Sequence, residues 1–190
     1  MSVIRKGTLE DASNIFELYK KVSSIYPDNL AQQIDEVNFS YIQAEIKNAQ
    51  LHGLVLLMFN DGKLIGFVKA YTSEFRRKAH VLTNATMMMD PTAVGQGFGT
   101  QLLEAYLDEL QKSLRHIRVM ELLPYDLNVK GIRLYERMGF VLTATLPNKI
   151  RYLNGTFGDQ LLMNWINPSF CDQVLLQYYQ YLKTLNNVET

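Results

Sequence analysis

Hydrophobic spacing in the first third of the chain predicts two amphipathic helices. Apolar residues recur every three or four positions over residues 12–22 and again over residues 39–50, which is typical of helices with one buried face. Thr8 and Asp11 have the spacing of a capping box before the first helix, and a short strand is expected at residues 3–6. The sequence Tyr-Pro-Asp-Asn at residues 26–29 ends that helix.

Continuous apolar runs predict buried strands in the middle of the chain. Residues 54–59 and 64–71 flank a polar segment with an Asp-Gly pair, which favours a tight hairpin turn. A third run covers residues 81–89 and stops before Pro91, which cannot continue a hydrogen-bonded ladder. The segment at residues 74–78 carries Arg76-Arg77-Lys78 and is expected to be a solvated loop.

The second half of the chain alternates helical and extended patterns. We expect a helix at 98–114, a buried strand at 117–123, a short helix at 128–138, an antiparallel pair of strands at 141–146 and 161–165, and a last amphipathic helix at 170–185. The strands at 81–89 and 117–123 flank a helix, which predicts a parallel pair joined by a right-handed crossover. Ligands bind at the carboxyl ends of such strands.

Composition narrows the class of protein. The chain has 190 residues, of which 47% are hydrophobic, so one globular domain is expected over residues 1–168, with residues 169–190 as a helical extension packed on it. The formal net charge is zero, which argues against nucleic acid and anionic membranes as partners. A single cysteine and three scattered histidines predict no disulfide and no metal site. No apolar leader or spanning segment is visible, so a cytoplasmic protein is expected.

A glycine-rich turn between a strand and a helix is the first candidate for chemistry. Gly95, Gly97 and Gly99 stand at alternate positions directly before the helical pattern. Glycines let backbone N–H groups converge without interference from Cβ atoms, and the helix adds the positive end of its dipole, so the turn suits an anion such as phosphate. No Lys-Ser/Thr pair follows the last glycine and no Rossmann pattern surrounds it, which excludes those two nucleotide sites.

Two motifs together resemble the GCN5-related N-acetyltransferase (GNAT) superfamily. The first is Val94-Gly95-Gln96-Gly97-Phe98-Gly99 in the turn, and the second is Asn128-Val129-Lys130-Gly131-Ile132-Arg133-Leu134-Tyr135-Glu136-Arg137-Met138-Gly139-Phe140. Their order and separation match the family, as does the ending from Gly155 through Asp159 to Met163. The resemblance covers roughly residues 3–166. It implies an α/β (α+β) fold with a mostly antiparallel mixed sheet, splayed at one parallel strand pair and flanked by helices.

The resemblance also implies acetyl-coenzyme A as co-substrate and assigns residues to it. The pyrophosphate is expected on the loop, and the pantetheine arm along the strand that precedes it. Asn128 resembles the residue that reaches the pantetheine amides, and Tyr135 the residue whose hydroxyl faces the thioester sulfur. The remaining cofactor-binding residues are Met87, Met88, Met89, Gly95, Gln96, Gly97, Phe98, Gly99 and Thr100. An open strand edge is required, from a bulge or splay between strands ending near Met89 and Leu123, with Pro124 at the parting point.

Three residues depart from the family pattern. Val94 stands where Arg or Gln is usual, so the pyrophosphate must rely on main-chain donors. Gly131 replaces the usual Ala, which lowers helix propensity by roughly 1 kcal/mol and opens space beside the cofactor. Asn84 stands where many members carry a glutamate that acts as base. The general base is then Glu121, His80, Asp126 or a water chain, in that order of preference.

The predicted function is N-acetyl transfer from acetyl-coenzyme A to a primary amine, either a small molecule or a protein amine. The alternative is a domain that binds acyl-coenzyme A as a sensor or assembly module without turnover. The acceptor pocket is expected from residues 24–39 and the loops near Glu74 and Asn148, which carry no recognisable motif. The tyrosines at 178–181 are expected to pack the last helix onto the sheet or onto a second subunit, so a homodimer stays open.

Overall fold

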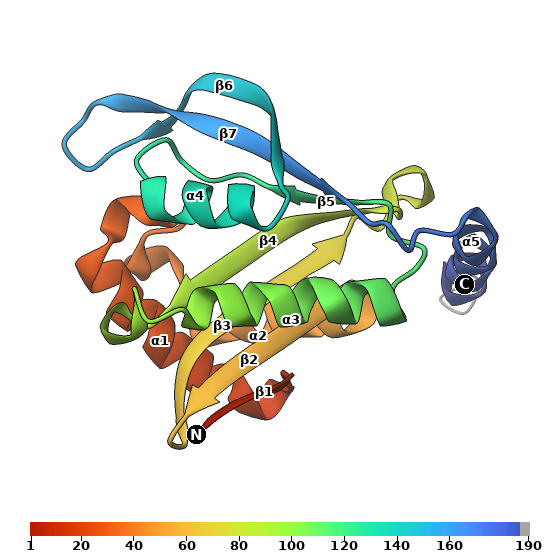
Figure 1. Ribbon diagram of the computed structural model, residues 1–190, viewed down its shortest axis with the longest axis horizontal. Helices are drawn as coiled ribbons and strands as arrows, with labels where there is room; N and C mark the ends of the chain where they lie inside the picture. The colour runs from red at the N-terminus through yellow and green to blue at the C-terminus, as the bar shows by residue number, and fades with distance from the viewer. Residues whose placement is uncertain (187–190) are drawn as a thin grey trace.

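A seven-stranded sheet forms the centre of the computed structural model, which describes residues 1–186 of the chain (Figure 1). The strand order is β1-β2-β3-β4-β5-β7-β6. Only the β4–β5 pair is parallel, and the other neighbours are antiparallel. The strands are β1 Ser2–Lys6, β2 Gly53–Asn60, β3 Lys63–Thr72, β4 Val81–Met89, β5 Val119–Leu122, β6 Val141–Arg151 and β7 Phe157–Ile166. The helices are α1 Ala12–Ile25, α2 Phe39–His52, α3 Phe98–Ser113, α4 Val129–Arg137 and α5 Asp172–Asn186.

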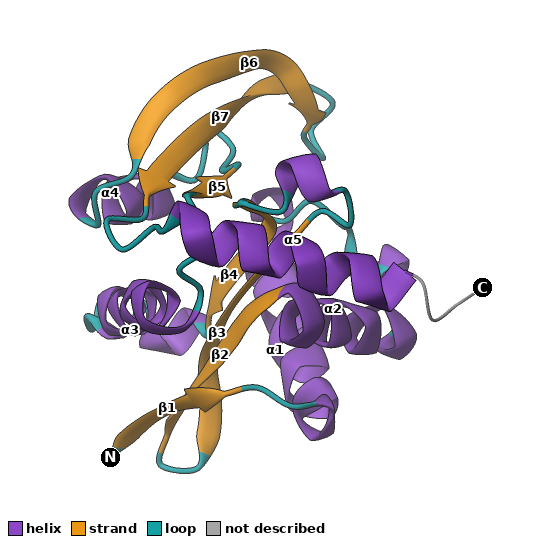
Figure 2. Cartoon of the chain, turned by 90° about the vertical axis from the view of Figure 1, so that its right-hand side faces the viewer, coloured by secondary structure: helices purple, strands orange, loops and turns teal. Residues whose placement is uncertain are grey.

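Helices cover the sheet on both faces, with α3 on one side of the strands and α1 and α2 on the other (Figure 2). Alternate residues of each strand point to opposite faces, so each strand contributes to two cores. Leu57, Phe67 and Met88 pack with α1 and α2, whereas Met58 and Val68 pack with α3. Because both faces of β2 and β3 are buried, these strands have continuous apolar sequences and not an alternation of apolar and polar residues.

The parallel pair between β4 and β5 is very short. Only Val81 and Leu82 of β4 pair with β5, at Val119 and Met120. On its other edge β5 pairs with β7 along its whole length, and past its end the Leu161 N–H donates to the Pro124 carbonyl at 2.9 Å. The two strands therefore part seven residues before the end of β4. The sequence prediction of a parting point at Pro124 is wrong, because the strands have separated before that residue.

A bulge in β4 lies directly after the paired residues. Lys69 pairs with Thr86 and Tyr71 pairs with Thr83, so β4 holds one more residue than β3 over this interval. Asn84 lies in the bulge with φ +49°, in the left-handed region. Asparagine tolerates this region better than most residues, because its short polar side chain bonds locally. The bulge bends β4 where the sheet opens.

Several element boundaries differ from the sequence predictions. β6 and β7 are longer than the predicted strands, and β5 is shorter. Most of β6 is exposed, and its pairing with β7 is irregular between Leu146 and Ile150, around Pro147. A strand with polar exposed residues has no hydrophobic alternation to detect, so only the pairing reveals it.

The last helix packs against the turn that precedes β5. The Tyr178 ring stacks on His116 with 3.9 Å between ring centroids, and the Cys171 N–H donates to the Arg115 carbonyl at 2.8 Å. Leu182 is buried, whereas Leu176 is 60% exposed. α5 thus contacts its own chain through one face. Over the residues described, no helix is both long and apolar enough to span a membrane.

Candidate active site

A cavity of about 440 Å³ lies where β4 and β5 part. Tyr135 and Asn128 line it from α4, on one face of the sheet, while Tyr41 and Glu45 line it from α2, on the other. The cavity therefore runs through the sheet at the splay. The described residues that complete its wall come from α1, the α1–α2 connection, β3, β4, β5, the β5–α4 connection and β7, and they are Tyr19, Asn29, Leu30, Ala31, Gln32, Lys69, Tyr71, Thr83, Asn84, Ala85, Thr86, Met87, Glu121, Leu122, Leu123, Pro124, Tyr125 and Gln160.

Tyr135 projects from α4 into this cavity and is only 8% exposed. Its ring packs against Phe140, with 5.9 Å between centroids and an interplanar angle of 57°. Burial raises the pKa of Tyr135 to about 12. The phenol therefore keeps its proton at neutral pH and can serve as a hydrogen-bond donor or an acid inside the cavity.

Asn128 caps the N-terminus of α4. Its Oδ1 accepts a hydrogen bond from the Gly131 N–H at 3.1 Å, and a Cβ atom at Gly131 would lie 2.7–2.9 Å from the Asn128 carboxamide. A larger residue at position 131 would therefore displace the Asn128 side chain, and the space beside Gly131 is filled by Asn128 and not left for a ligand. The carboxamide nitrogen carries two N–H donors, and Asn128 lines the cavity.

The glycine turn leads directly into the N-terminus of α3. Gly95 and Gly97 have φ values of +86° and +83°, and Gly97 is the N-cap residue of the helix. The first N–H groups of a helix have no intrahelical acceptor and are free to bind an anion. A Cβ atom added at Gly99 would lie 3.6–3.7 Å from the side chains of Leu134, Met87 and Met89. The turn is thereby held beside β4 and α4.

The end of β4 presents one free edge. Met87, Met88 and Met89 pair with β3 on one side, and β5 has already diverged on the other. The side chain of Met88 is buried with α1 and α2, while Met87 and Met89 pack on the α3 side. All three side chains therefore pack in the cores, although Met87 also lines the cavity, and the backbone edge that faces β5 is available to a ligand.

The three candidate bases lie in different surroundings. Glu121 of β5 lines the cavity, whereas His80 and Asp126 are not among the residues of its wall. The His80 carbonyl accepts hydrogen bonds from the N–H groups of Arg118 and Val119, at the start of β5. The Asp126 carboxylate accepts a hydrogen bond from the Tyr152 hydroxyl, which ties the β6–β7 hairpin to the β5–α4 connection. Its position on the cavity wall favours Glu121 over the other two residues as the general base.

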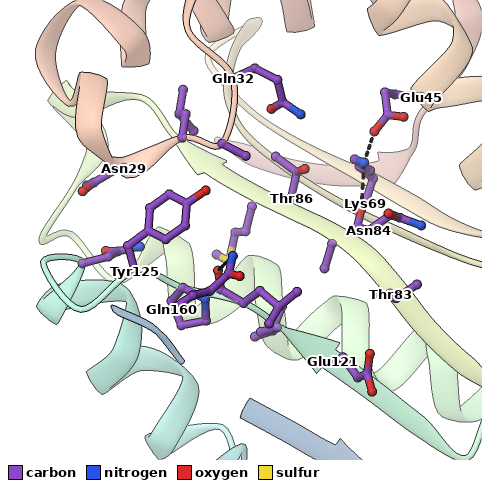
Figure 3. Close-up of a pocket in the computed structure, with 18 of the residues that line it drawn as sticks. Asn29, Gln32, Glu45, Lys69, Thr83, Asn84, Thr86, Glu121, Tyr125 and Gln160 are labelled. Carbon is purple, nitrogen blue, oxygen red and sulfur yellow. Dashed lines mark hydrogen bonds and ion pairs between the residues drawn. The ribbon is translucent and has the colours of Figure 1, made fainter. Parts of the chain in front are cut away.

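A cluster of charged and aromatic side chains faces Glu121 from the other side of β4, and sequence reasoning missed it. Glu45 of α2 forms an ion pair with Lys69 of β3 (Figure 3). The Glu45 Oε1 also accepts a hydrogen bond from the Tyr71 hydroxyl at 2.8 Å. Lys69 Nζ also donates to the Asn84 carbonyl at 2.8 Å. One signal was available, because Lys69 is a charged residue within an otherwise apolar strand.

The α1–α2 connection forms the far wall of the cavity. The side chains of Asn29 and Gln32 lie across the opening from Tyr125 (Figure 3). Asp28 accepts a hydrogen bond from the Leu153 N–H at 2.9 Å, which joins this connection to the tip of the β6–β7 hairpin. Of the expected acceptor segments, residues 29–32 line the cavity, and Asn148 does not.

A second hollow of about 640 Å³ adjoins the cavity. Both hollows are lined by Tyr71, Thr83, Asn84 and Glu121, so Glu121 lies where they meet. The remaining wall of the second hollow is largely polar and consists of Asn48, His52, Thr72, Ser73, Glu74, Lys78 and Val81. The groove on the α2 face therefore continues beyond the splay. No cluster of three His, Cys, Asp or Glu side chains suited to a metal ion occurs among the described residues.

Comparison with known proteins identifies the family and the fold. The model of the acetyltransferase (GNAT) family matches residues 15–140. An acetyltransferase of the GNAT family from Streptococcus pneumoniae has a TM-score of 0.79 at 22% identity, over 87% of this chain and 99% of that chain. YncA from Salmonella typhimurium, solved with its cofactor acetyl-CoA, has a TM-score of 0.79 at 22% identity, over 90% and 96% of the two chains.

A third structure is the ribosomal-protein-alanine N-acetyltransferase from Brucella melitensis. Its TM-score is 0.75 at 20% identity, and the match covers 86% of this chain and 99% of that chain. Identities this low show the shared fold alone. No protein with curated function matches the sequence significantly.

Proposed function

The chain belongs to the acetyltransferase (GNAT) family, and from this premise we propose that it transfers an acetyl group from acetyl-coenzyme A to a primary amine. The observation that carries the proposal is the cavity through the splayed sheet. Tyr135 and Asn128 enter it from the face that also holds the glycine turn, and Glu121 and the α1–α2 connection bound it from the other face. Two reactants can therefore approach the same point from opposite sides.

The residues present fit acetyl-coenzyme A. The turn from Gly95 to Thr100 offers main-chain donors for phosphates, which compensates for Val94 in place of a side-chain donor. The free edge of Met87, Met88 and Met89 offers backbone groups to the pantetheine amides, in the way that a peptide adds to a sheet edge. The co-substrate supplies a thioester whose carbonyl carbon is the electrophile. No step of this reaction requires a metal ligand from the chain.

In this proposal Glu121 is the general base and Tyr135 is the general acid. A lysine-like amine with a pKa of about 10.4 is mostly protonated at neutral pH and attacks only as the free base. Glu121 accepts the proton of the amine, directly or through water. Tyr135, still protonated at neutral pH because burial raises its pKa to about 12, donates to the coenzyme sulfur as it leaves.

A sensor that binds acyl-coenzyme A without turnover is the second candidate. It is favoured by Asn84, which replaces a carboxylate on β4 with a residue suited to the left-handed backbone of the bulge. Glu121 weighs against it, because the cavity regains a carboxylate from β5.

Release of free coenzyme thiol from acetyl-coenzyme A, measured against a panel of amines, tests the proposal. The panel should contain polyamines, amino acids, amino-acid amides and peptides with free amino termini. We expect thiol release that depends on at least one amine and is saturable in it. Tight binding of acetyl-coenzyme A by calorimetry, with no amine-dependent release from any member of the panel, would support the sensor and contradict acetyl transfer.

A further inference from the structure

The ion pair between Glu45 and Lys69 lies on the side of the cavity where the acceptor arrives in the proposed reaction. The Lys69 side chain is buried, with 7% of its surface exposed, and the Glu45 side chain is partly buried, with 16% exposed. Each has further partners, because Lys69 Nζ donates to the Asn84 carbonyl and Glu45 accepts from the Tyr71 hydroxyl. Lys69 Nζ also lies 4.9 Å from the centroid of the Tyr71 ring. The ammonium of Lys69 therefore has two hydrogen-bond acceptors and one aromatic ring as partners within the protein.

The charges that line the cavity are unevenly balanced. Among the described residues of its wall, Lys69 is the only cation, while Glu45 and Glu121 are carboxylates. Glu45 neutralises Lys69, and Glu121 has no ion pair with a described residue. An acceptor in this cavity is thus exposed to the unpaired carboxylate of Glu121. The only cation of the described wall, Lys69, is already paired with Glu45 and does not offer a charge to an anion.

This distribution of charge in the cavity distinguishes amine acceptors by the charge of the group that lies next to the amine nitrogen. A free amino acid carries a carboxylate beside its amine, and that carboxylate would lose water without gaining a cation while facing the charge of Glu121. An amide at the same place carries no charge. It would find neutral hydrogen-bonding groups on Asn29, Gln32 and Gln160, which line the same cavity.

We propose that the Glu45–Lys69 pair sets the acceptor specificity by withholding Lys69 from anions, so that the acceptor is a primary amine whose neighbouring carboxyl is amidated, as at the amino terminus of a peptide. The inference rests on the proposed acetyl transfer and names its substrate class. Free amino acids are excluded by charge and not by size.

The second hollow supports an acceptor longer than one residue. It meets the cavity at Glu121, Asn84, Thr83 and Tyr71, and its volume of about 640 Å³ exceeds that of the cavity itself. Its only lysine, Lys78, lies with Glu74 in the same wall. A peptide whose amino group lies near Glu121 has space to continue there, whereas a single amino acid leaves the hollow empty.

Matched acceptors test the wild-type specificity. The value of kcat/KM is measured for alanine, alaninamide and an alanyl tripeptide with an amidated carboxyl end. Each value is expressed per unit of unprotonated amine, because a neighbouring carboxylate also raises the pKa of the amine itself. We expect alaninamide and the tripeptide to exceed alanine by about a hundredfold or more. Values within threefold of one another would overturn the inference.

Glu45→Gln tests the role of the pair. The variant keeps the shape of the side chain and releases Lys69, whose countercharge can then come from the carboxylate of alanine. We expect the preference for alaninamide over alanine to fall at least tenfold. Adding Lys69→Met to Glu45→Gln should restore the preference, because no cation remains. Glu17→Gln, which breaks the exposed Lys20–Glu17 pair on α1, is the matched control and should keep the wild-type preference.

The outcomes separate this inference from the proposed function. If no acceptor of either kind is acetylated while acetyl-coenzyme A binds, the proposed acetyl transfer fails and the inference fails with it. If both kinds are acetylated and Glu45→Gln leaves their ratio within threefold of wild type, only the inference is overturned. Should Glu45→Gln not fold, the wild-type ratio alone decides.

Discussion

Single residues in the cavity derive their properties from burial and backbone conformation. Tyr135 is kept protonated by desolvation, and Asn84 occupies a left-handed position where its residue type is favoured. At Gly131, a Cβ atom would lie 2.7–2.9 Å from the Asn128 carboxamide, so a larger residue there would displace that side chain. Local structure thus bears on two of the three departures from the family pattern.

Tyr135→Phe tests the acid at the residue scale. Phe keeps the ring and its packing against Phe140 but removes the hydroxyl. We expect turnover to fall roughly 10²-fold, the usual size of a general-acid contribution, with the affinity for acetyl-coenzyme A unchanged. Steady-state kinetics and calorimetry measure the two quantities.

Tyr106→Phe is the matched control, because Tyr106 is a buried tyrosine outside the cavity whose hydroxyl donates to the Leu54 carbonyl. It should lose stability and keep turnover. Turnover of Tyr135→Phe within about threefold of wild type would remove Tyr135 from the acid role and leave proximity as the main source of rate.

Gly97→Val tests the glycine turn as the anion site. A side chain at φ +83° strains the backbone by roughly 1–2 kcal/mol and points atoms toward the bound phosphates. We expect the affinity for acetyl-coenzyme A to fall about tenfold or more, as measured by calorimetry.

Gly62 offers a matched control on the β2–β3 hairpin. Its φ is +78°, and a Cβ atom added there meets nothing within 4 Å, as is also true of Gly97. Gly62→Val should therefore cost similar stability without loss of affinity. Equal affinities for both variants and wild type would show that phosphates bind elsewhere.

At the scale of elements, the parting of β4 from β5 creates the site. The strands share two residue pairs, after which a bulge bends β4 and β5 continues along β7. The cavity, the free edge of residues 87–89 and the approach of α4 all follow from this divergence. Lys69 stabilises the bulge by its hydrogen bond to the Asn84 carbonyl, so β3 also helps to shape the opening.

The contact between α5 and the turn before β5 should make stability depend on pH. Burial lowers the pKa of His116 from 6.5 to about 4, and its ring stacks on Tyr178. Between these pH values the unfolded chain binds a proton that the folded protein excludes, so stability falls as pH drops from 6.5 to 4 and the penalty is absent above 6.5. The expected loss at pH 5 is on the order of 2 kcal/mol.

Urea unfolding at pH 7.5 and pH 5 measures this effect. His116→Phe retains an aromatic ring against Tyr178 but carries no proton, so its stability should change less between the two pH values than that of wild type. An equal change in both proteins would show that other groups cause the acid sensitivity.

At the scale of the whole molecule, side-chain contacts hold separate elements together. The α1–α2 connection meets the β6–β7 hairpin, 125 residues away, through Asp28 and Leu153. Within the first eleven residues, Arg5 binds the buried carboxylate of Asp11 through two hydrogen bonds of 2.8 and 2.6 Å. The first contact closes the far side of the cavity. The second anchors β1 to the start of α1.

Truncation after Pro168 tests the contribution of the last helix. Removing it uncovers His116 and deletes the Cys171–Arg115 hydrogen bond. We expect the free energy of unfolding to fall by roughly 2 kcal/mol, which lowers the melting temperature by about 5 °C for a chain of this size. Calorimetry measures this change, and sedimentation velocity reports whether the exposed face around Leu176 also joins two copies. An unchanged melting temperature would show that α5 contributes nothing to the stability of the domain.

The sequence by itself determined the order and type of the elements, the parallel strand pair, the glycine turn and the family. These features depend on local causes: hydrophobic periodicity, turn chemistry and short motifs within a few residues of one another. The prediction of a mostly antiparallel sheet that splays at one parallel pair is confirmed by the structure. The division into residues 1–168 and 169–190, the cytoplasmic location and the assigned site residues stay predictions.

Only the tertiary structure decided what surrounds the reacting groups. Glu45 and Lys69 are separated by 24 residues, and no local pattern links them. The position of Glu121 on the cavity wall, where His80 and Asp126 do not lie, and the parting of the strands at Leu82 likewise depend on pairing between distant segments. Pairings of this kind gain their energy from burial and hydrogen bonds formed on folding. They leave no periodic signal in one sequence, because each partner satisfies its own local rules without reference to the other.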